Sequence, residues 1–406
     1  MKVGVITSWP PEISGLSDYS KQLYETLASL APKIKIYAHT PSKLQKANTS
    51  YKQGNSLEVK YAWTNKDPLY PFKLLKAIIR DNVEIVHVQH EYWLYGRGLK
   101  ALLLPVLLAL LRLMRKTVVI TLHGLLVLTQ LDKDFKKFHK FNVPLYLLKI
   151  FSIVYVRILS ILSNIVIVHL NVMKEILKYQ YGVNAEKVHV IPHGILGMRT
   201  DSILNDINRE EKVVFTTFGS IRPDKGIENI LKAFSKLAKI YDNVKLIIAG
   251  QYNPSMSPEA SGYLNVIQNA IRRLNLEKHV MLKLNLPYEE VCNIYRKSYA
   301  VILNYLDKSV IAASGPLALA FAFAKPVIAS KIPRFLEYRN FMLLVDPENI
   351  DKLAKYMGEL IENKNLYSSL TRKLEALRNT YSWQNIAKEH LDMYVKLVRC
   401  PTTLHY

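Results

Sequence analysis

Short apolar runs alternate with longer amphipathic stretches along the first half of the chain. The longer stretches, Tyr19–Ala31 and Pro71–Asp81 among them, have the hydrophobic spacing of helices. Runs of Val and Ile between helices are typical of parallel strands that are buried on both faces of a sheet. The expected strands are Val3–Ile6, Ile34–Ala38, Ile85–Val88, Thr117–Leu122, Ile165–His169 and Val188–Ile191. This pattern predicts a doubly wound α/β domain over residues 1–199.

The same alternation begins again after residues 200–212, a polar and charged stretch that we interpret as a linker. The strands expected beyond it are Val213–Phe218, Val244–Ala249, Val280–Leu284, Ala300–Leu303, Pro326–Ala329 and Met342–Val345. A second Rossmann-like domain is therefore predicted at residues 213–382. The remaining residues, 383–406, are expected to form a helix that packs back on the first domain. Because ligands bind at the carboxyl ends of strands in such sheets, two facing domains predict a cleft between them.

Composition narrows the class of protein. The chain has 406 residues, a formal net charge of +22, 50% hydrophobic residues and two cysteines. This length and hydrophobic content exclude a disulfide miniprotein and a disordered chain, and the cysteine count favours a reducing compartment. The first apolar run is too short for a signal peptide, and Leu99–Met114 is too short and too interrupted to span a membrane. The charge predicts an anionic partner: a nucleic acid, a membrane surface or a phosphorylated substrate.

The sharpest local motif lies where the first strand of the second domain ends and a helix begins. It reads FGSIRPDKGI and contains Gly219, Arg222 and Lys225. A glycine lets a ligand approach the backbone, the helix N-terminus offers free N–H groups, and Arg can bind phosphate with two parallel hydrogen bonds. These residues form a candidate diphosphate clamp. The alternative is a capped surface turn with two solvated charges.

Two further helix starts are candidate anion sites. Ser314 and Gly315 open the apolar helix Leu317–Ala324, and Gly15 lies in the loop between the first strand and the first helix. By themselves, these residues are also explained as an ordinary N-cap and an ordinary loop.

Histidines follow three strands of the first domain. They are His90, with Glu91 beside it, His123 and His193. Three histidines at one edge of a sheet indicate a site, although a single one would more often be structural. Their spacing matches no zinc pattern, and no Walker loop or G-x-G-x-x-G follows the first strand. Asp132 and Asp134 lie in a charge run that is typical of a solvated face. We therefore expect no metal and no bound cofactor.

In their order and spacing, these motifs resemble the family-four nucleotide-sugar glycosyltransferases of the GT-B fold. The segments that carry the resemblance are SWPPEISGLSDYS, VEIVHVQHEYWLYG, VVITLHG, VIVHLNVMKEILKYQYGVNAEKVHVIPHGI, FGSIRPDKGIENILKAF, LIIAGQY and ASGPLALAFAFAKPVIAS. They span nearly the whole chain, from Met1 to Tyr394. The resemblance implies a hexosyltransferase that binds a nucleotide-sugar in the second domain and its acceptor in the first. It also implies retention of the anomeric configuration without a metal.

The resemblance also implies roles for individual residues. Arg222 and Lys225 match the pair that holds the donor diphosphate and stabilises the leaving group, and His123 matches a histidine near the donor sugar. The other matched positions are Gly15 beside the donor phosphates, Gly219 in the clamp, Ser314 and Gly315 at the phosphate-binding helix start, and Asn285 to Tyr288 around the base. His90, Glu91 and His193 remain candidates for the acceptor side of the cleft.

The chain departs from the family pattern at one place. Typical members have two glutamates, eight positions apart, that contact the donor sugar and the ribose, and the corresponding residues here are Ile311 and Leu319. The chain resembles a subgroup with Ser-Gly at this helix start. This departure leaves open a non-catalytic relative that binds a ligand or a partner.

Positive charge is concentrated in the first domain. Residues 97–157 hold 11 basic and two acidic residues. Within this segment Val143–Asn164 reads as an amphipathic helix, with its polar side chains in one arc and Leu, Ile, Val, Phe and Tyr opposite. A helix of this kind lies in an anionic membrane interface or is a buried crossover helix. We favour the first, and hence a peripheral protein on the cytoplasmic face of a membrane with a glycan or lipid-linked acceptor. A nucleic-acid-binding protein is a weaker alternative, because no reader motif is present.

Overall fold

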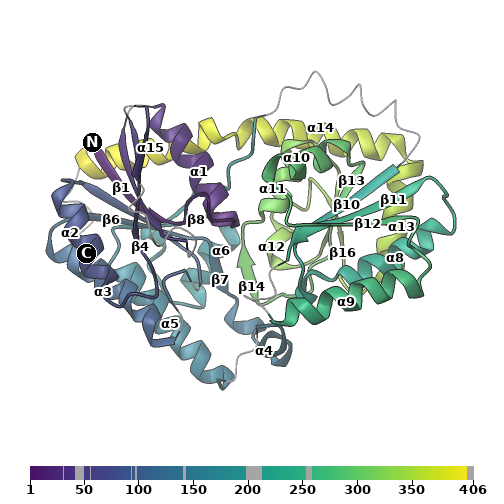
Figure 1. The fold of residues 1–406 in the computed structure, drawn as a ribbon, viewed down its shortest axis with the longest axis horizontal. Coiled ribbons are helices and arrows are strands. Elements are labelled where there is room, and N and C mark those ends of the chain that lie inside the picture. The colour runs from purple at the N-terminus through teal and green to yellow at the C-terminus, as the bar shows by residue number, and fades with distance from the viewer. Residues whose placement is uncertain are drawn as a thin grey trace.

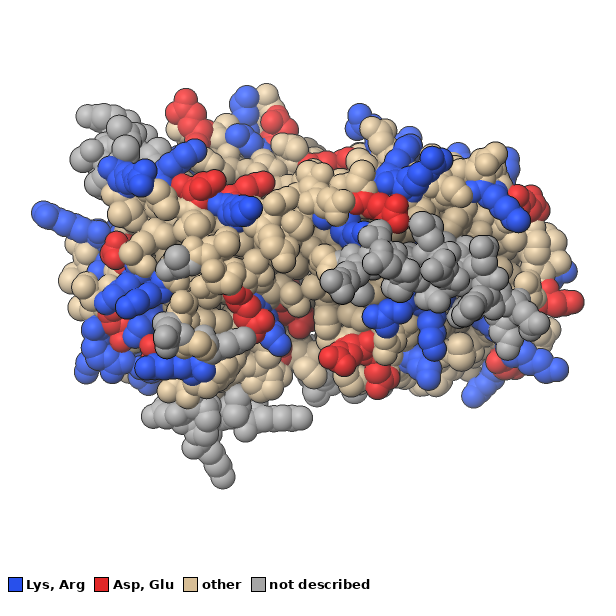
Figure 2. Space-filling model, turned by 90° about the horizontal axis from the view of Figure 1, so that it is seen from above, with Lys and Arg blue, Asp and Glu red and all other residues tan. Residues whose placement is uncertain are grey.

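The chain forms two α/β domains that lie side by side (Figure 1), and Lys and Arg side chains are spread over both of them on the face seen in Figure 2. The computed structural model describes residues 1–30, 32–41, 50–54, 56–92, 94–96, 98–139, 143–197, 213–252 and 258–399. Both domains have a central, mainly parallel sheet with helices on both faces, which confirms the predicted fold class. The predicted linker, residues 200–212, lies outside the described residues.

The sheet of the first domain has eight strands in the order β3-β4-β2-β1-β5-β6-β8-β9. The strands are β1 (Lys2–Thr7), β2 (Lys33–His39), β3 (Ser50–Gln53), β4 (Leu57–Trp63), β5 (Ile85–His90), β6 (Thr117–Leu122), β8 (Ile165–Val168) and β9 (Val188–Val190). Only the β3–β4 pair is antiparallel. The sequence analysis did not predict β3 or β4. Buried and partly buried residues alternate along β4, so this strand lacks the continuous apolar run of its neighbours.

Alternate residues of these strands face two separate helix layers. Ile85 packs on one side with α1 (Gly15–Ala28), whereas Val86 packs on the other side with α3 (Leu103–Leu113). The remaining helices of the domain are α2 (Tyr70–Arg80), α4 (Lys133–His139), α5 (Leu145–Ile161) and α6 (Asn171–Tyr179). The two-residue period of a strand thus divides the apolar residues between the two faces of the sheet.

The second domain has six parallel strands in the order β12-β11-β10-β13-β15-β16. They are β10 (Val213–Ser220), β11 (Val244–Gln251), β12 (Val280–Leu284), β13 (Ala300–Leu303), β15 (Val327–Ser330) and β16 (Leu343–Val345). Its helices are α8 (Ile227–Ala238), α9 (Pro258–Arg273), α10 (Tyr288–Lys297), α11 (Gly315–Ala322), α12 (Pro333–Leu336), α13 (Ile350–Glu362) and α14 (Lys364–Thr380). The expected strands of this domain all form: Val280–Leu284 and Ala300–Leu303 have the expected bounds, and the ends of the other four shift by one or two residues.

The last helix, α15 (Trp383–Arg399), crosses from the second domain to the first (Figure 1). Its residues Trp383, Ile386 and Tyr394 join the apolar core that α1 forms with the first sheet. Gly194 allows the start of α15 to come close, because a Cβ at this position would lie only 2.3 Å from ring atoms of Trp383. The helix therefore fastens the two domains together.

A small antiparallel sheet joins the domains within the cleft region. It pairs β7 (Gly124–Leu126) of the first domain with β14 (Val310–Ala312) of the second (Figure 1). Ile311 of β14 is fully buried in the core of the first domain. A second contact follows at α6, where the backbone N–H and the side-chain amide of Asn171 both donate to the Glu337 carboxylate at 2.8 Å. These contacts hold the two carboxyl strand edges face to face.

Candidate active site

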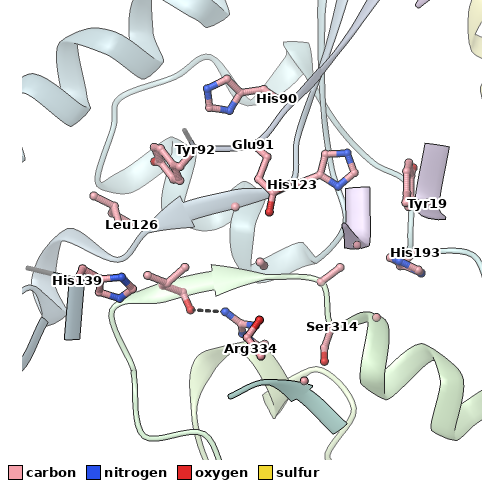
Figure 3. A pocket seen from close by; sticks show the side chains of 18 of the residues that line it. Tyr19, His90, Glu91, Tyr92, His123, Leu126, His139, His193, Ser314 and Arg334 are labelled. Atoms are coloured by element: carbon pink, nitrogen blue, oxygen red, sulfur yellow. Dashed lines mark hydrogen bonds between the residues drawn. The ribbon is translucent and has the colours of Figure 1, made fainter. Parts of the chain in front are cut away.

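A cavity of about 1110 Å³ lies between the two domains. Its lining comes from the carboxyl ends of strands and the helix starts that follow them, as expected for facing sheets of this type. In Figure 3, His90, Glu91 and His123 extend from the first domain, and Ser314 and Arg334 lie on the opposite side. The volume exceeds the roughly 300–1,000 Å³ of most small-molecule sites, so the cavity has room for more than one bound group.

Arg222 and Lys225 line this cavity and share one buried carboxylate. The Nε and Nη2 atoms of Arg222 donate to the two carboxylate oxygens of Asp224, both at 2.9 Å, and Lys225 Nζ lies 3.2 Å from Asp224 Oδ2. Burial alone would raise the pKa of Asp224, but the charges of Lys225 and Arg222 outweigh it and hold that pKa well below its usual range. Asp224 therefore fixes two cations at the cavity wall. The sequence analysis did not single out Asp224, although it lies inside the predicted motif.

The backbone of the FGSIRPDKGI segment explains why Arg222 and Lys225 lie at the cavity wall. Strand β10 ends at Ser220, residues Pro223–Lys225 form one short 3-10 turn, and Gly226 starts α8 with φ 59°. A Cβ on Gly226 would lie 2.2 Å from the backbone oxygen of Asn304, so only glycine permits this left-handed turn beside β13. The turn directs Arg222 and Lys225 toward the opposite domain.

The two predicted helix starts also face the cavity. Ser14 caps α1 through a 3.1 Å bond from Ser17 N–H, and Gly15 is the first residue of this helix. Ser314 caps α11 through a 3.4 Å bond from Leu317 N–H. The Ser314 hydroxyl therefore serves as an N-cap, which was the alternative to an anion site. A Cβ at Gly15 or Gly315 would meet nothing within 4 Å, so space remains beside both helix starts for a ligand.

Arg334 is a third cation of the cavity that the sequence analysis missed. It lies in α12, and its Nη2 donates to the backbone oxygen of Val310 in β14 at 3.2 Å (Figure 3). Its buried Nε has no hydrogen-bond partner. The Tyr305 ring lies 3.9 Å from Lys225 Nζ and 5.5 Å from the Arg334 guanidinium carbon, so it separates these two charges. An arginine in a short loop helix has no sequence signature that would have revealed this position.

His123 belongs to a hydrogen-bonded network inside the first domain. Its Nε2 lies 2.7 Å from Gln89 Oε1, and its Nδ1 lies 3.1 Å from His169 Nε2. His169 Nδ1 donates to the backbone oxygen of Ile191 at 2.9 Å, so the Nε2 of a neutral His169 can only accept. Because the Gln89 oxygen and this His169 nitrogen are both acceptors, a neutral His123 can donate to only one of them at a time. A hydrogen bond donated by this ring to a donor sugar requires that bond to be released.

Burial keeps the histidines at the carboxyl edge of the first-domain sheet neutral. Burial, together with the neighbouring His169 and His193, lowers the pKa of His123 well below its usual range. Burial also lowers the pKa of His193 and of His90 to about 4. His193 Nδ1 donates to the backbone oxygen of Gly194, and His90 Nε2 lies 3.3 Å from the Tyr155 hydroxyl. The three histidines that the sequence placed at one strand edge all line the cavity.

The first-domain wall of the cavity carries two acidic residues, Glu91 and Asp18, and burial raises the pKa of Asp18 to about 6. The Glu91 side chain reaches into the cavity from the end of β5 and points toward β14 (Figure 3). Although the side chain is open to the cavity, the surrounding protein walls, together with the charge of Glu12, raise the pKa of Glu91 to about 7. Glu91 can therefore exchange a proton near neutral pH, which is the requirement for a general base or acid.

Only some of the remaining predicted residues line the cavity in the described part of the chain. Tyr288 lines the cavity, whereas Asn285 does not, and its side-chain amide is paired with the backbone of Tyr252 at 2.8 and 3.0 Å. Leu319 lines the cavity. Ile311, at the other glutamate position of the family, points away from it into the core of the first domain. At this position the side chain makes a contact between the two domains.

No group of three or more His, Cys, Asp or Glu side chains that could hold a metal ion occurs in the described part of the chain. The cationic wall of Arg222, Lys225 and Arg334 is suited instead to an anion.

The fold and this site together define a class of protein, the GT-B glycosyltransferases. Solved structures share the fold over the full length of the chain. Sucrose-phosphate synthase from Thermosynechococcus elongatus matches with a TM-score of 0.75 at 15% identity, covering 98% of this chain and 100% of that one. Anabaena HepE in complex with UDP and glucose matches with a TM-score of 0.68 at 15% identity and the same coverage. At these identities the likeness shows the fold alone.

Two family models match the chain one after the other. Residues 13–195 match Glycosyltransferase Family 4, and residues 200–376 match Glycosyl transferases group 1. The chain belongs to family four of the glycosyltransferases.

Curated relatives match a part of the chain. The lipopolysaccharide 1,2-N-acetylglucosaminetransferase of Salmonella typhimurium is 25% identical over 221 residues, which are 52% of this chain and 57% of that protein. The mannosylfructose-phosphate synthase of Agrobacterium fabrum is 25% identical over 244 residues, which are 57% of this chain and 52% of that protein. The matched part spans about half the length of these curated relatives.

Proposed function

We propose that the chain transfers a sugar from a nucleotide-diphosphate sugar to an acceptor bound on the first domain, with retention of the anomeric configuration and without a metal. The observation that carries this proposal is the pair Arg222 and Lys225, fixed by Asp224 on the wall of the cavity between the domains. Family membership and relatives named for glycosyl transfer support it.

The cationic wall supplies the chemistry that departure of a nucleotide diphosphate needs. Negative charge grows on the diphosphate as the glycosidic bond breaks, and preorganised cations stabilise that charge. Arg222 offers parallel N–H donors for phosphate oxygens, and Lys225 supplies a second charge beside it. The starts of α1 and α11 add backbone N–H groups on either side of the cleft. The leaving diphosphate then assists removal of the acceptor proton on the same face of the sugar.

The acceptor side of the cleft is the first domain. Glu91, with its pKa near neutral, lies where an acceptor hydroxyl would approach the donor. We propose a glycan or lipid-linked acceptor and a peripheral position on the cytoplasmic face of a membrane. The 11 basic residues between positions 97 and 157 support that position. Among the described residues, no helix is both long and apolar enough to cross a bilayer.

The test combines a thermal-shift panel of UDP-, GDP- and ADP-sugars with an assay of sugar transfer or donor hydrolysis on each hit. The Arg222→Ala variant should keep the fold and lose turnover, whereas Arg339→Ala, at an exposed position of the same domain, should retain it. Full turnover in Arg222→Ala would contradict the proposed role of the clamp. Retention of configuration is read from the anomeric proton of the product, and turnover in excess EDTA tests independence from metal.

A second candidate is a non-catalytic relative that binds a nucleotide-sugar. Ile311 favours it, because its position supplies an interdomain contact in place of a sugar-binding carboxylate. Binding of a nucleotide-sugar without hydrolysis or transfer, across a panel of glycan and lipid acceptors, would favour this candidate.

A further inference from the structure

The cavity between the domains has an apolar extension away from the three cations. From the clamp it continues along the first domain to α4 and α5, at the lower edge of the domain in Figure 1. We call this extension the apolar arm and define it by Leu126, Phe135, Leu147, Leu148, Phe151 and Tyr155. The apolar arm and the clamp belong to one continuous space, so a single ligand can occupy both.

Helix α5, which forms one wall of the apolar arm, is apolar on two sides. It buries Leu148, Tyr155, Val156 and Leu159 against the protein and exposes a second apolar side. Its serines Ser152 and Ser160 are buried against the protein. In contrast, Ile150 is 56% exposed, Phe151 is 42% exposed and Ile161 is 71% exposed. Arg157 of the predicted polar arc is also exposed, so apolar residues of this helix are divided between the protein and the exposed side. The exposed apolar side chains form a surface that water solvates poorly.

The apolar lining of the arm determines which kind of acceptor can bind there. A sugar in the arm would bring hydroxyl groups against Leu147, Phe151 and their apolar neighbours, where hydrogen bonds to water are lost without replacement. A hydrocarbon chain in the same place loses no hydrogen bonds. It also gains favourable burial against both the arm and the exposed face of α5.

Charge around the arm favours a lipid that carries phosphate. Lys133 and Lys136 lie on α4, and Lys149 lies on α5, the two helices that form the arm. The segment between positions 97 and 157 has a net charge of +9 from its Lys, Arg, Asp and Glu residues. Basic residues beside an exposed apolar helix face complement an anionic membrane surface.

We infer that the apolar arm receives the hydrocarbon chain of a lipid-phosphate-linked acceptor, which enters from an anionic membrane over the exposed face of α5. This inference rests on the proposed glycosyl transfer for the identity of the acceptor. The phosphate-linked end of the acceptor would extend from the arm toward Glu91 and the donor.

The test measures binding of butyl, octyl and dodecyl phosphate to the full chain by titration calorimetry, below the concentrations at which they form micelles. In the wild type, affinity should rise with chain length by roughly fourfold for each CH₂ that enters the arm. Phe151→Glu should remove this rise, and Phe151→Leu should keep it. Ile161→Glu, at an exposed apolar position of the same helix that does not line the cavity, should also keep it. Circular dichroism verifies the fold of each variant.

Equal affinity for the three alkyl phosphates in the wild type would overturn the inference. Equal losses in Phe151→Glu and Ile161→Glu would also overturn it, because they would indicate adhesion to the helix surface rather than occupation of the arm. Binding of UDP, GDP and ADP is measured on the same samples. A chain-length effect without nucleotide binding would support the arm and contradict the proposed transfer reaction, whereas nucleotide binding without a chain-length effect would contradict the arm alone.

Discussion

Arg222 donates two parallel hydrogen bonds, both 2.9 Å long, to the carboxylate of Asp224 two residues further along the chain. Lys225 binds the same carboxylate, so one buried anion orients both cations of the clamp. The arrangement is local, because all three residues belong to a single turn between β10 and α8. It explains how two long, mobile side chains are held ready for a diphosphate before any ligand binds.

Replacing Asp224 by Asn should reduce donor turnover. The guanidinium of Arg222 would lose its charged partner. Part of the free energy of donor binding would then be needed to orient the guanidinium. We expect kcat/KM to fall by at least roughly tenfold, in line with the loss of a charged hydrogen-bonding pair. The matched control is Asp351→Asn, which removes an exposed carboxylate that pairs with Lys236. Wild-type kinetics in Asp224→Asn would show that the carboxylate has no positioning role.

Glu91 should impose a pH dependence on transfer near neutrality. Its pKa is raised to about 7, so the side chain is mainly protonated below that pH and mainly ionised above it. An ionised carboxylate beside the acceptor stabilises the positive charge that grows on the attacking hydroxyl as its proton passes to the leaving diphosphate, so the rate should rise with pH through about 7. Glu91→Gln should lower kcat and remove this rise, and the pH profiles of the two proteins measure it. An unchanged profile in the variant would assign the ionisation to another group.

The buried histidines should destabilise the fold in mild acid. The pKa values of His90, His193 and His390 are lowered by burial to about 4, below the roughly 6.5 of an unfolded chain. Between these values the unfolded state binds more protons than the folded state, so stability is complete above about pH 6.5 and is lost as the pH falls. Each histidine should contribute a loss on the order of 2 kcal/mol between about pH 7 and pH 5.

The measurement is urea denaturation at both pH values. His390 has a buried Nε2 without a partner and does not line the cavity, so His390→Gln is a suitable test variant. This variant should lose less stability on acidification than the wild type. The same pH dependence in both proteins would exclude His390 as a contributor.

Introducing the family glutamate at position 311 should not restore a sugar contact. Ile311 is fully buried in the core of the first domain, on a strand that pairs with β7. Ile311→Glu would place a carboxylate among apolar side chains, which should destabilise the protein by more than about 3 kcal/mol. Ile311→Val, the control, should lower the free energy of unfolding by about 0.5–1.5 kcal/mol. A stable Ile311→Glu variant with higher turnover would indicate that this side chain turns toward the donor.

Much of the fold and the clamp can be predicted from the sequence because both depend on local patterns. Continuous runs such as Val118–Leu122 predict buried parallel strands, and the residues around Arg222 and Lys225 lie in one contiguous turn. The pairing of β7 with β14 joins positions far apart in the chain, and each strand has only three residues, too few to show a period. Arg334 reaches the cavity from a four-residue helix, a position that depends on tertiary structure alone.

The orientation of α5 is a second feature that could not be predicted from the sequence. Its sequence reveals a polar arc and an apolar arc, but not which of them faces the protein. Ser152 is buried together with Leu148 and Tyr155, whereas Phe151 is exposed where it lines the cavity. This division depends on the placement of α5 beside the cavity, which its sequence does not show.

The most direct test of the account is titration calorimetry of a nucleoside diphosphate with the wild type and Arg222→Ala. The ligand is whichever of UDP, GDP and ADP binds the wild type most tightly, and Arg339→Ala is the control. The account predicts that Arg222→Ala weakens binding by at least roughly tenfold, because it removes a charge-assisted pair of hydrogen bonds to phosphate, and that the control binds as the wild type does. Equal affinity in all three proteins would contradict the assignment of Arg222 to the diphosphate.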